Sequence, residues 1–169
     1  MAKAAKAAKT KTQPVRRPAE GDLAPAFDLA ADGGRRIALG ALEGKSVVLY
    51  FYPKDDTSGC TKEAIDFSAE AKSFAKAGAV IVGISRDSVE RHDKFKAKYD
   101  LKVDLASDPE GKICAAYGVW VEKSLYGRKF MGIERSTFLI DPKGRVSKAW
   151  RKVSVTDHVA EVLKALRGT

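Results

Sequence analysis

Hydrophobic residues recur along this chain with two different periods, and the alternation between them predicts the order of strands and helices. Continuous runs of β-branched, aliphatic and aromatic residues are typical of strands covered on both faces, and such runs occupy residues 46–52 and 79–84. Further strands are predicted at residues 103–106 and 136–140. Apolar residues at helical spacing predict helices at residues 61–76 and from residue 156 onward, a charged surface helix is predicted at 88–99, and a turn followed by a short helix at 109–117. The pattern favours an α/β domain with a mixed central sheet and helices on both faces.

Turn-forming residues add two hairpins to this outline. Asp32-Gly33-Gly34 separates residues 26–31 from residues 35–39, which predicts an N-terminal hairpin. Asp141-Pro142-Lys143-Gly144 follows the strand at 136–140 and predicts a return strand at 145–150. Asp87 or Ser88 is expected to cap the helix that ends at Tyr99.

Charge divides the chain into two parts. The formal net charge is +9 over 169 residues, and residues 1–19 carry six basic residues and no acidic one. Residues 1–20 are therefore predicted to be a solvated, disordered extension, with a weak, salt-sensitive polyanion contact as the alternative. An organelle transit peptide is a further alternative, and no secretory signal is indicated. Residues 21–169 have the length of one domain.

Cysteine and histidine counts restrict the chemistry. The two cysteines, Cys60 and Cys114, are too few for a secreted disulfide framework. His92 and His158 show no metal-ligand spacing with them. No apolar run reaches the roughly 18–20 residues that span a bilayer. We therefore expect a cytoplasmic protein with no metal, no cofactor and no membrane contact.

The most informative segment joins the strand at 46–52 to the helix that follows it. Cys60 falls in the first turn of that helix, where free backbone N–H groups and the helix dipole favour a thiolate. Thr57 lies one turn earlier, and Pro53 stiffens the loop. Asp55 and Asp56 are expected to be solvated turn residues.

Several motifs in this chain closely resemble those of the peroxiredoxins, in the bacterioferritin comigratory protein or PrxQ subfamily. They are FYPKDDTSGCTKEA at 51–64, VGISRD at 82–87, SDPEGKICAAYGVW at 107–120 and ERSTFLIDPKG at 134–144. The resemblance implies a thioredoxin-like fold and reduction of hydrogen peroxide and organic hydroperoxides by a cysteine, without metal or haem. It assigns Pro53, Thr57, Cys60 and Arg135 to the catalytic site. Ser58 departs from the family, which usually has proline there.

Recycling of Cys60 is where the chain departs most from the family. Many relatives carry a resolving cysteine at the position of Ile65, and others carry one on the next helix, at 95–98, where this chain has none. The only internal candidate is Cys114, whose apolar neighbours predict a core position. We therefore expect a one-cysteine mechanism with an external thiol such as thioredoxin, glutaredoxin or glutathione. A two-cysteine mechanism through Cys114 is the alternative, and the chain is expected to be a monomer or weak dimer.

A thioredoxin-like disulfide oxidoreductase is the competing function. That activity needs Cys-x-x-Cys at the helix start, and here Thr57 occupies the first of the two positions. The substitution favours the peroxidase. Three further residues are weaker candidates for supporting the site: Arg86, Glu63 and Trp120.

Overall fold

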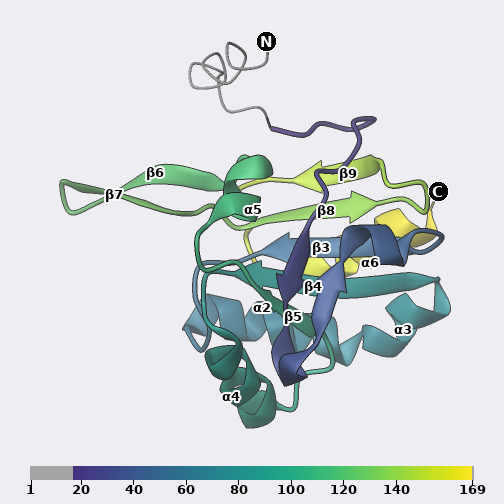
Figure 1. Ribbon diagram of the computed structural model, residues 1–169, viewed down its shortest axis with the longest axis horizontal. Helices are drawn as coiled ribbons and strands as arrows, with labels where there is room; N and C mark the ends of the chain where they lie inside the picture. Colours follow the sequence, from purple (N-terminus) through teal and green to yellow (C-terminus); the bar gives the residue numbers. More distant parts are fainter. Residues whose placement is uncertain (1–16, 169) are drawn as a thin grey trace, which may run out of the picture.

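A five-stranded mixed sheet forms the centre of the molecule. The computed structural model describes residues 17–168, and the strands run in the order β5-β4-β3-β8-β9 (Figure 1). β3 (Ser46–Phe51), β4 (Ala79–Ser85) and β5 (Asp104–Ser107) are parallel, whereas β8 (Ser136–Ile140) and β9 (Val146–Trp150) are antiparallel to their neighbours. The predicted mixed sheet is confirmed, because all five of its strands overlap the predicted ranges.

Two hairpins accompany the sheet, and only one of them was predicted. β1 (Asp28–Ala30) pairs with β2 (Arg36–Ala38) across a turn that includes a short 3₁₀ segment, as expected. β6 (Trp120–Leu125) and β7 (Arg128–Ile133) form a second hairpin that projects from the body (Figure 1). Its two-residue turn places Tyr126 and Gly127 at φ 51° and 77°, the left-handed pair that a type I′ turn requires.

Helices cover both faces of the sheet. They are α2 (Ser58–Ala69), α3 (Ala71–Lys76), α4 (Val89–Tyr99), α5 (Lys112–Ala116) and α6 (His158–Arg167), with a 3₁₀ turn at Leu39–Leu42. The single helix predicted at 61–76 is wrong in one respect, since Glu70 leaves helical geometry (φ −102°, ψ 10°) and separates α2 from α3. The Ser88 cap of α4 is confirmed, because its side chain accepts a hydrogen bond from the Arg91 N–H at 3.2 Å.

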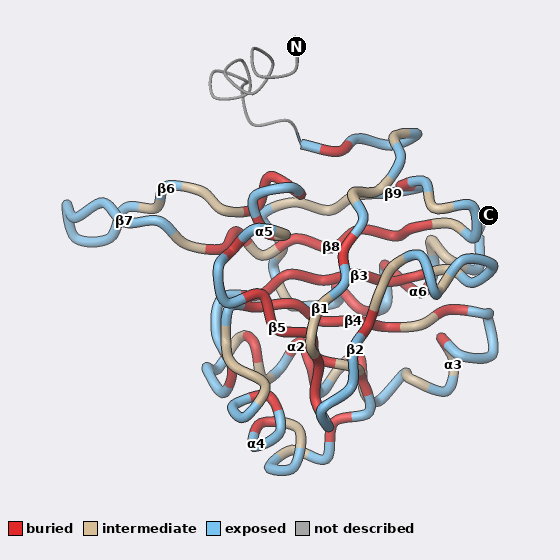
Figure 2. The backbone as a smooth tube through the Cα atoms, viewed as in Figure 1, coloured by how far each residue is buried: buried red, intermediate tan, exposed pale blue. Residues whose placement is uncertain are grey.

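The sheet separates two hydrophobic cores, and the alternation of side chains along β3 divides its residues between them. Val48 and Tyr50 join a cluster with α2, α3, α4 and α6, here called the Cys60-side core because it contains that residue. Val47 and Leu49 join the opposite cluster with α5 and the first hairpin, here called the Cys114-side core. The buried backbone in Figure 2 follows these strands through the middle of the molecule.

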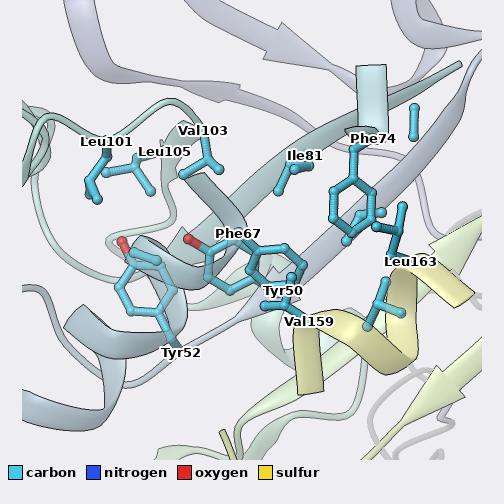
Figure 3. Packing of buried hydrophobic residues seen from close by; sticks show 14 of the residues in the cluster. Tyr50, Tyr52, Phe67, Phe74, Ile81, Leu101, Val103, Leu105, Val159 and Leu163 are labelled. Carbon is cyan, nitrogen blue, oxygen red and sulfur yellow. The ribbon is translucent and has the colours of Figure 1, made fainter. Parts of the chain in front are cut away.

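Aromatic residues dominate the Cys60-side core. Tyr50 stacks on Tyr52 and on Phe67 of α2, with ring centroids 5.5 and 4.7 Å apart (Figure 3). Val159 and Leu163 of α6 and Phe74 of α3 close the same cluster. Burying an aromatic or branched side chain contributes about 1.5–3 kcal/mol each, so this layer fixes α2 firmly against the sheet.

Residues on either side of β1 lie against the two outer strands of the sheet. Leu23 forms an isolated antiparallel bridge with Arg145, next to β9, and Ala31 forms one with Ala106 of β5. Earlier still, Pro18 is buried and Arg17 lies 3.7 Å from the Glu134 carboxylate. The rest of the predicted basic extension, residues 1–16, lies outside the described residues, as does residue 169. Within residues 17–168, no helix is long and apolar enough to cross a membrane.

Candidate active site

The loop from β3 to α2 lies at the carboxyl ends of the parallel strands, where open α/β sheets form their sites. β3 ends at Phe51, and α2 begins at Ser58 with Thr57 as its N-cap residue. The first helical hydrogen bond runs from the Thr61 N–H to the Thr57 carbonyl at 2.8 Å. Cys60 therefore occupies the first turn of α2, as predicted, and only 1% of it is exposed.

Arg135 connects Cys60 with a buried carboxylate. It lies between β7 and β8, 75 residues from Cys60 in sequence, and its Nη2 donates to the Cys60 Sγ at 3.3 Å. Its Nη1 donates to Glu63 Oε1 at 2.6 Å. Glu63 is fully buried one turn after Cys60 on α2. The structure thus brings Cys60, Arg135 and Glu63 together, with 16% of the Arg135 side chain exposed.

Burial and charge oppose each other in this group. Burial raises the pKa of Glu63 to about 7, while the Arg135 guanidinium works against that rise. Burial lowers the pKa of Arg135, but the negative partners Glu63 and Cys60 outweigh it and leave the pKa raised. The guanidinium therefore stays charged beside the sulfur, which favours negative charge there.

Gly59 provides the space for this contact. A Cβ at Gly59 would lie 3.2 Å from Arg135 Nη2, closer than ordinary van der Waals contact, so a side chain there would press on the guanidinium. The sequence analysis did not single out Gly59. Its position directly before Cys60 is the only signal that could have indicated it.

Thr57 and Pro53 lie in the loop between β3 and the first turn of α2, and both are exposed. The Thr57 hydroxyl donates to the Lys54 carbonyl at 2.8 Å and makes no capping bond to α2. The oxygen can still accept a hydrogen bond, because a hydroxyl has two lone pairs. Thr57 therefore closes the loop while its oxygen stays available at the start of α2.

The expectation that Asp55 is a solvated turn residue is wrong, because only 3% of it is exposed. Its carboxylate accepts hydrogen bonds from the Tyr52 hydroxyl at 2.6 Å and shares one with His92 Nδ1 at 2.7 Å. Asp56, in contrast, is exposed as expected. Local sequence does not distinguish the two aspartates, since the partner of Asp55 on α4, His92, lies 37 residues further on.

Two of the weaker candidates lie elsewhere. The Arg86 guanidinium sits 4.7 Å from the ring centroid of Trp120 and donates to the Pro109 carbonyl. Trp120 packs against the Cys114-side core. These two residues support each other on the opposite side of the sheet, whereas Glu63 alone of the three joins Cys60.

Two basic residues missed by the sequence analysis lie within electrostatic reach of the site. Burial lowers the pKa of Lys123 on β6, and Arg135 lowers it further. Burial and then Arg135 lower the pKa of His158 to about 4, and His158 shares a 2.8 Å hydrogen bond with Thr137 of β8. His158 is therefore neutral at physiological pH.

Cys114 has a different environment. It is fully buried in α5, within the Cys114-side core, as predicted. Burial raises its pKa well above the ordinary value, and the neighbouring Asp108 raises it further. Within the described residues, no group of three or more metal-ligating side chains is arranged to hold an ion.

Comparison with known proteins identifies the family. The model of the AhpC/TSA family matches residues 21–149. The chain belongs to this family and is a peroxiredoxin. It is 52% identical over 147 residues to Peroxiredoxin Bcp of Bacillus subtilis, covering 87% of this chain and 94% of that one. It is 50% identical over 146 residues to Peroxiredoxin Bcp of Xanthomonas campestris, covering 85% and 91%.

Solved structures agree with this membership. The peroxiredoxin superimposes on Xanthomonas campestris Peroxiredoxin Q with a TM-score of 0.81 at 49% identity, covering 84% of this chain and 90% of that one. The match confirms the predicted thioredoxin-like fold and the resemblance to the bacterioferritin comigratory protein subfamily. The chain is therefore a thiol peroxidase.

Proposed function

We propose that this peroxiredoxin reduces hydrogen peroxide and organic hydroperoxides at Cys60, in a one-cysteine cycle that an external thiol completes. The observation that carries the proposal is the position of the Cys60 sulfur, in the first turn of α2 and 3.3 Å from a guanidinium nitrogen. A Xanthomonas campestris bacterioferritin comigratory protein, 48% identical to this chain, is described for its alkyl peroxide reduction activity. That description supports organic hydroperoxides as substrates.

The first half of the cycle oxidises the sulfur. The Cys60 thiolate attacks one oxygen of the hydroperoxide, the O–O bond breaks, and the other oxygen leaves as an alcohol or water after taking a proton. The sulfur becomes a sulfenic acid. Arg135 and the free N–H groups at the start of α2 stabilise the charge that develops between sulfur and the leaving oxygen. Thr57 positions the hydroperoxide, and Pro53 stiffens the loop.

The second half returns the sulfur to the thiol. One external thiol condenses with the sulfenic acid and releases water, which leaves a mixed disulfide on Cys60. A second thiol attacks that disulfide, frees Cys60 and departs as the oxidised reductant. Two external thiols are thus consumed for each hydroperoxide. Thioredoxin, glutaredoxin and glutathione are the candidate reductants.

The separation of the two cysteines supports the one-cysteine cycle. A disulfide requires Cα atoms within about 7 Å unless the backbone moves. Cys60 belongs to one core and Cys114 to the other, with the sheet between them. A Cys60–Cys114 bond would require one of the two cores to open.

Paired substitutions test the proposal. In a thiol-coupled peroxide assay, Cys60→Ser is expected to abolish turnover, whereas Cys114→Ala keeps the wild-type rate per folded molecule. Each reductant is supplied separately, and the one that supports the fastest turnover is the preferred donor. Substantial turnover in Cys60→Ser would overturn the assignment of Cys60, and loss of turnover in a folded Cys114→Ala variant would overturn the one-cysteine cycle.

A further inference from the structure

Helix α4 holds the loop before Cys60 through two consecutive carboxylates, Asp55 and Asp56. The first is buried and the second is exposed. Neither carboxylate contacts Cys60 or Arg135 in the hydrogen bonds described above, so the proposed chemistry does not use them directly. Apart from the Tyr52 hydroxyl, the side-chain partners of the two carboxylates lie on α4, which makes this helix the outer support of the loop.

The buried contact depends on a shared proton. His92 is fully buried, and its Nδ1 lies 2.7 Å from Asp55 Oδ2 while its Nε2 lies 3.0 Å from the Ala106 carbonyl oxygen. The carbonyl can only accept, so Nε2 carries a proton. The 2.7 Å contact needs a second proton, held by His92 or by Asp55. In either arrangement the pair is neutral overall, which is the form that burial tolerates.

The exposed contact holds a left-handed backbone. Asp56 has φ 60°, a conformation in which aspartate is more frequent than most residues but which still costs free energy. Its carboxylate accepts hydrogen bonds from the Tyr99 hydroxyl at 2.7 Å and from Lys98 Nζ at 2.9 Å. Both donors lie at the end of α4, so the helix stabilises the reversal of the chain at Asp56.

A third contact fixes the backbone of the same loop. The Asp55 N–H donates to Asp87 Oδ2 at 2.8 Å, and Asp87 in turn accepts from the Ser85 hydroxyl at 2.7 Å and from Arg91 Nε at 3.1 Å. Arg91 belongs to the first turn of α4. The loop is therefore held at a backbone amide and at two side chains, immediately before the residue that caps α2.

We propose that α4 positions this loop for the reaction with hydroperoxide, with His92 and Tyr99 as positioning residues that act through Asp55 and Asp56. The inference rests on the proposed function, since it concerns the placing of Thr57 and of the first turn of α2. A misplacement of about 1 Å can cost on the order of 100-fold in rate. Loosening the α4 contacts should therefore slow attack on hydroperoxide while Cys60 keeps its general thiol reactivity.

The test compares two reactions of the same sulfur. Oxidation by stoichiometric hydrogen peroxide, followed by sulfenic acid labelling, reports on positioning, and alkylation by iodoacetamide at the same pH reports on general reactivity. His92→Gln and Tyr99→Phe are expected to lower the oxidation rate by about tenfold or more and to change the alkylation rate by less than about threefold. Lys94→Met is the matched control on an exposed position of α4, and it should leave both rates unchanged.

A conservative pair separates positioning from a loss of folding. Asp56→Asn keeps an acceptor for Tyr99 and tolerates the left-handed backbone, so it should retain most of the oxidation rate, whereas Asp56→Ala should not. Asp56 is exposed, so these variants report even if His92→Gln does not fold. Equal ratios of oxidation to alkylation in wild type, Tyr99→Phe and Asp56→Ala would overturn the inference. Failure of the proposed function is distinguishable, because it appears as peroxide turnover in Cys60→Ser.

Discussion

Cys60 and Cys114 lie in the two cores on opposite faces of one sheet, and the groups around the two sulfurs differ. Cys60 lies at the start of a helix, with a guanidinium 3.3 Å away and a carboxylate behind it. Cys114 lies inside a five-residue helix among apolar side chains, and burial raises its pKa. Both are almost completely buried. Burial therefore does not distinguish Cys60, the proposed reactive thiol, from Cys114, whereas the charges beside the two sulfurs differ.

Direct oxidation tests this contrast with the largest expected effect. After stoichiometric hydrogen peroxide and a sulfenic acid trap, mass analysis should place the label on Cys60 and none on Cys114. Cys114 becomes accessible only when the fold opens, so its oxidation is expected to be slower by about 10³-fold or more. An intramolecular Cys60–Cys114 disulfide in the non-reduced protein would contradict the contrast. Cys114→Ala serves as the control for label assignment.

The two arginines beside the two cores sharpen the comparison. Arg135→Ala should lower the rate of peroxide reduction by about 100-fold, since removing one donor to the developing charge typically costs that much. Arg86→Ala is the matched control, because Arg86 lies over Trp120 on the Cys114 side, and it should keep most of the rate. The measurement is the second-order rate constant for hydrogen peroxide. Similar losses in both variants would mean that net charge, and not the contact with Cys60, matters.

His158, which packs against Phe67 of the Cys60-side core, is expected to make the free energy of unfolding depend on pH in the acid range. The pKa of His158 is lowered to about 4 in the folded protein. Between about pH 6.5 and pH 4, the unfolded chain therefore binds a proton at this histidine that the folded chain does not bind. The free energy of unfolding should therefore fall as the pH drops from 6.5 towards 4. His158→Gln, which keeps an amide able to pair with the Thr137 hydroxyl, should show a smaller fall in urea midpoint between pH 7.5 and pH 5. Lys164→Gln, exposed on the same helix, should behave as wild type.

The basic extension should affect neither cysteine. Removing residues 1–16 preserves the contact of Arg17 with Glu134 and is expected to leave peroxide turnover unchanged. At low salt the full chain should bind DNA weakly, and binding should fall steeply as salt is added. A retardation assay with both forms measures this difference. Equal DNA binding by the two forms would mean that the basic residues of the extension do not contact DNA.

The central strands β3 and β4 were predictable because their runs of apolar residues fit only a strand buried on both faces. Residues 46–51 of β3 fall within the predicted strand at 46–52, since a nearly continuous apolar run covered on both faces has no polar side to expose. β6 and β7 were missed for the opposite reason. Their residues are mostly exposed or half-buried, so their sequence carries no strong hydrophobic pattern. The signal that was present is the Tyr126-Gly127 pair, which the hairpin turn uses at positive φ.

The candidate active site was predictable only for residues that lie close together in the sequence. Cys60 and Thr57 follow from the strand, loop and helix start around them, whereas Arg135 came from the family resemblance alone. Its contacts with Cys60 and Glu63 span more than 70 residues, and no periodicity encodes them. The burial of Asp55 has the same origin, because its neutralising partner His92 reaches it only through the packing of α4 on the sheet.

The segment from Gly21 to Ala31, which includes β1, contacts both outer strands of the sheet. Ala31 pairs with Ala106 on the outer strand β5, while Gly21 and Asp22 bond both backbone groups of Val146 on the outer strand β9. An open edge is a template on which another chain can add a strand. This segment thus occupies part of that template at both edges of the sheet, so cleavage within it should promote intermolecular strand pairing even if the site around Cys60 stays intact.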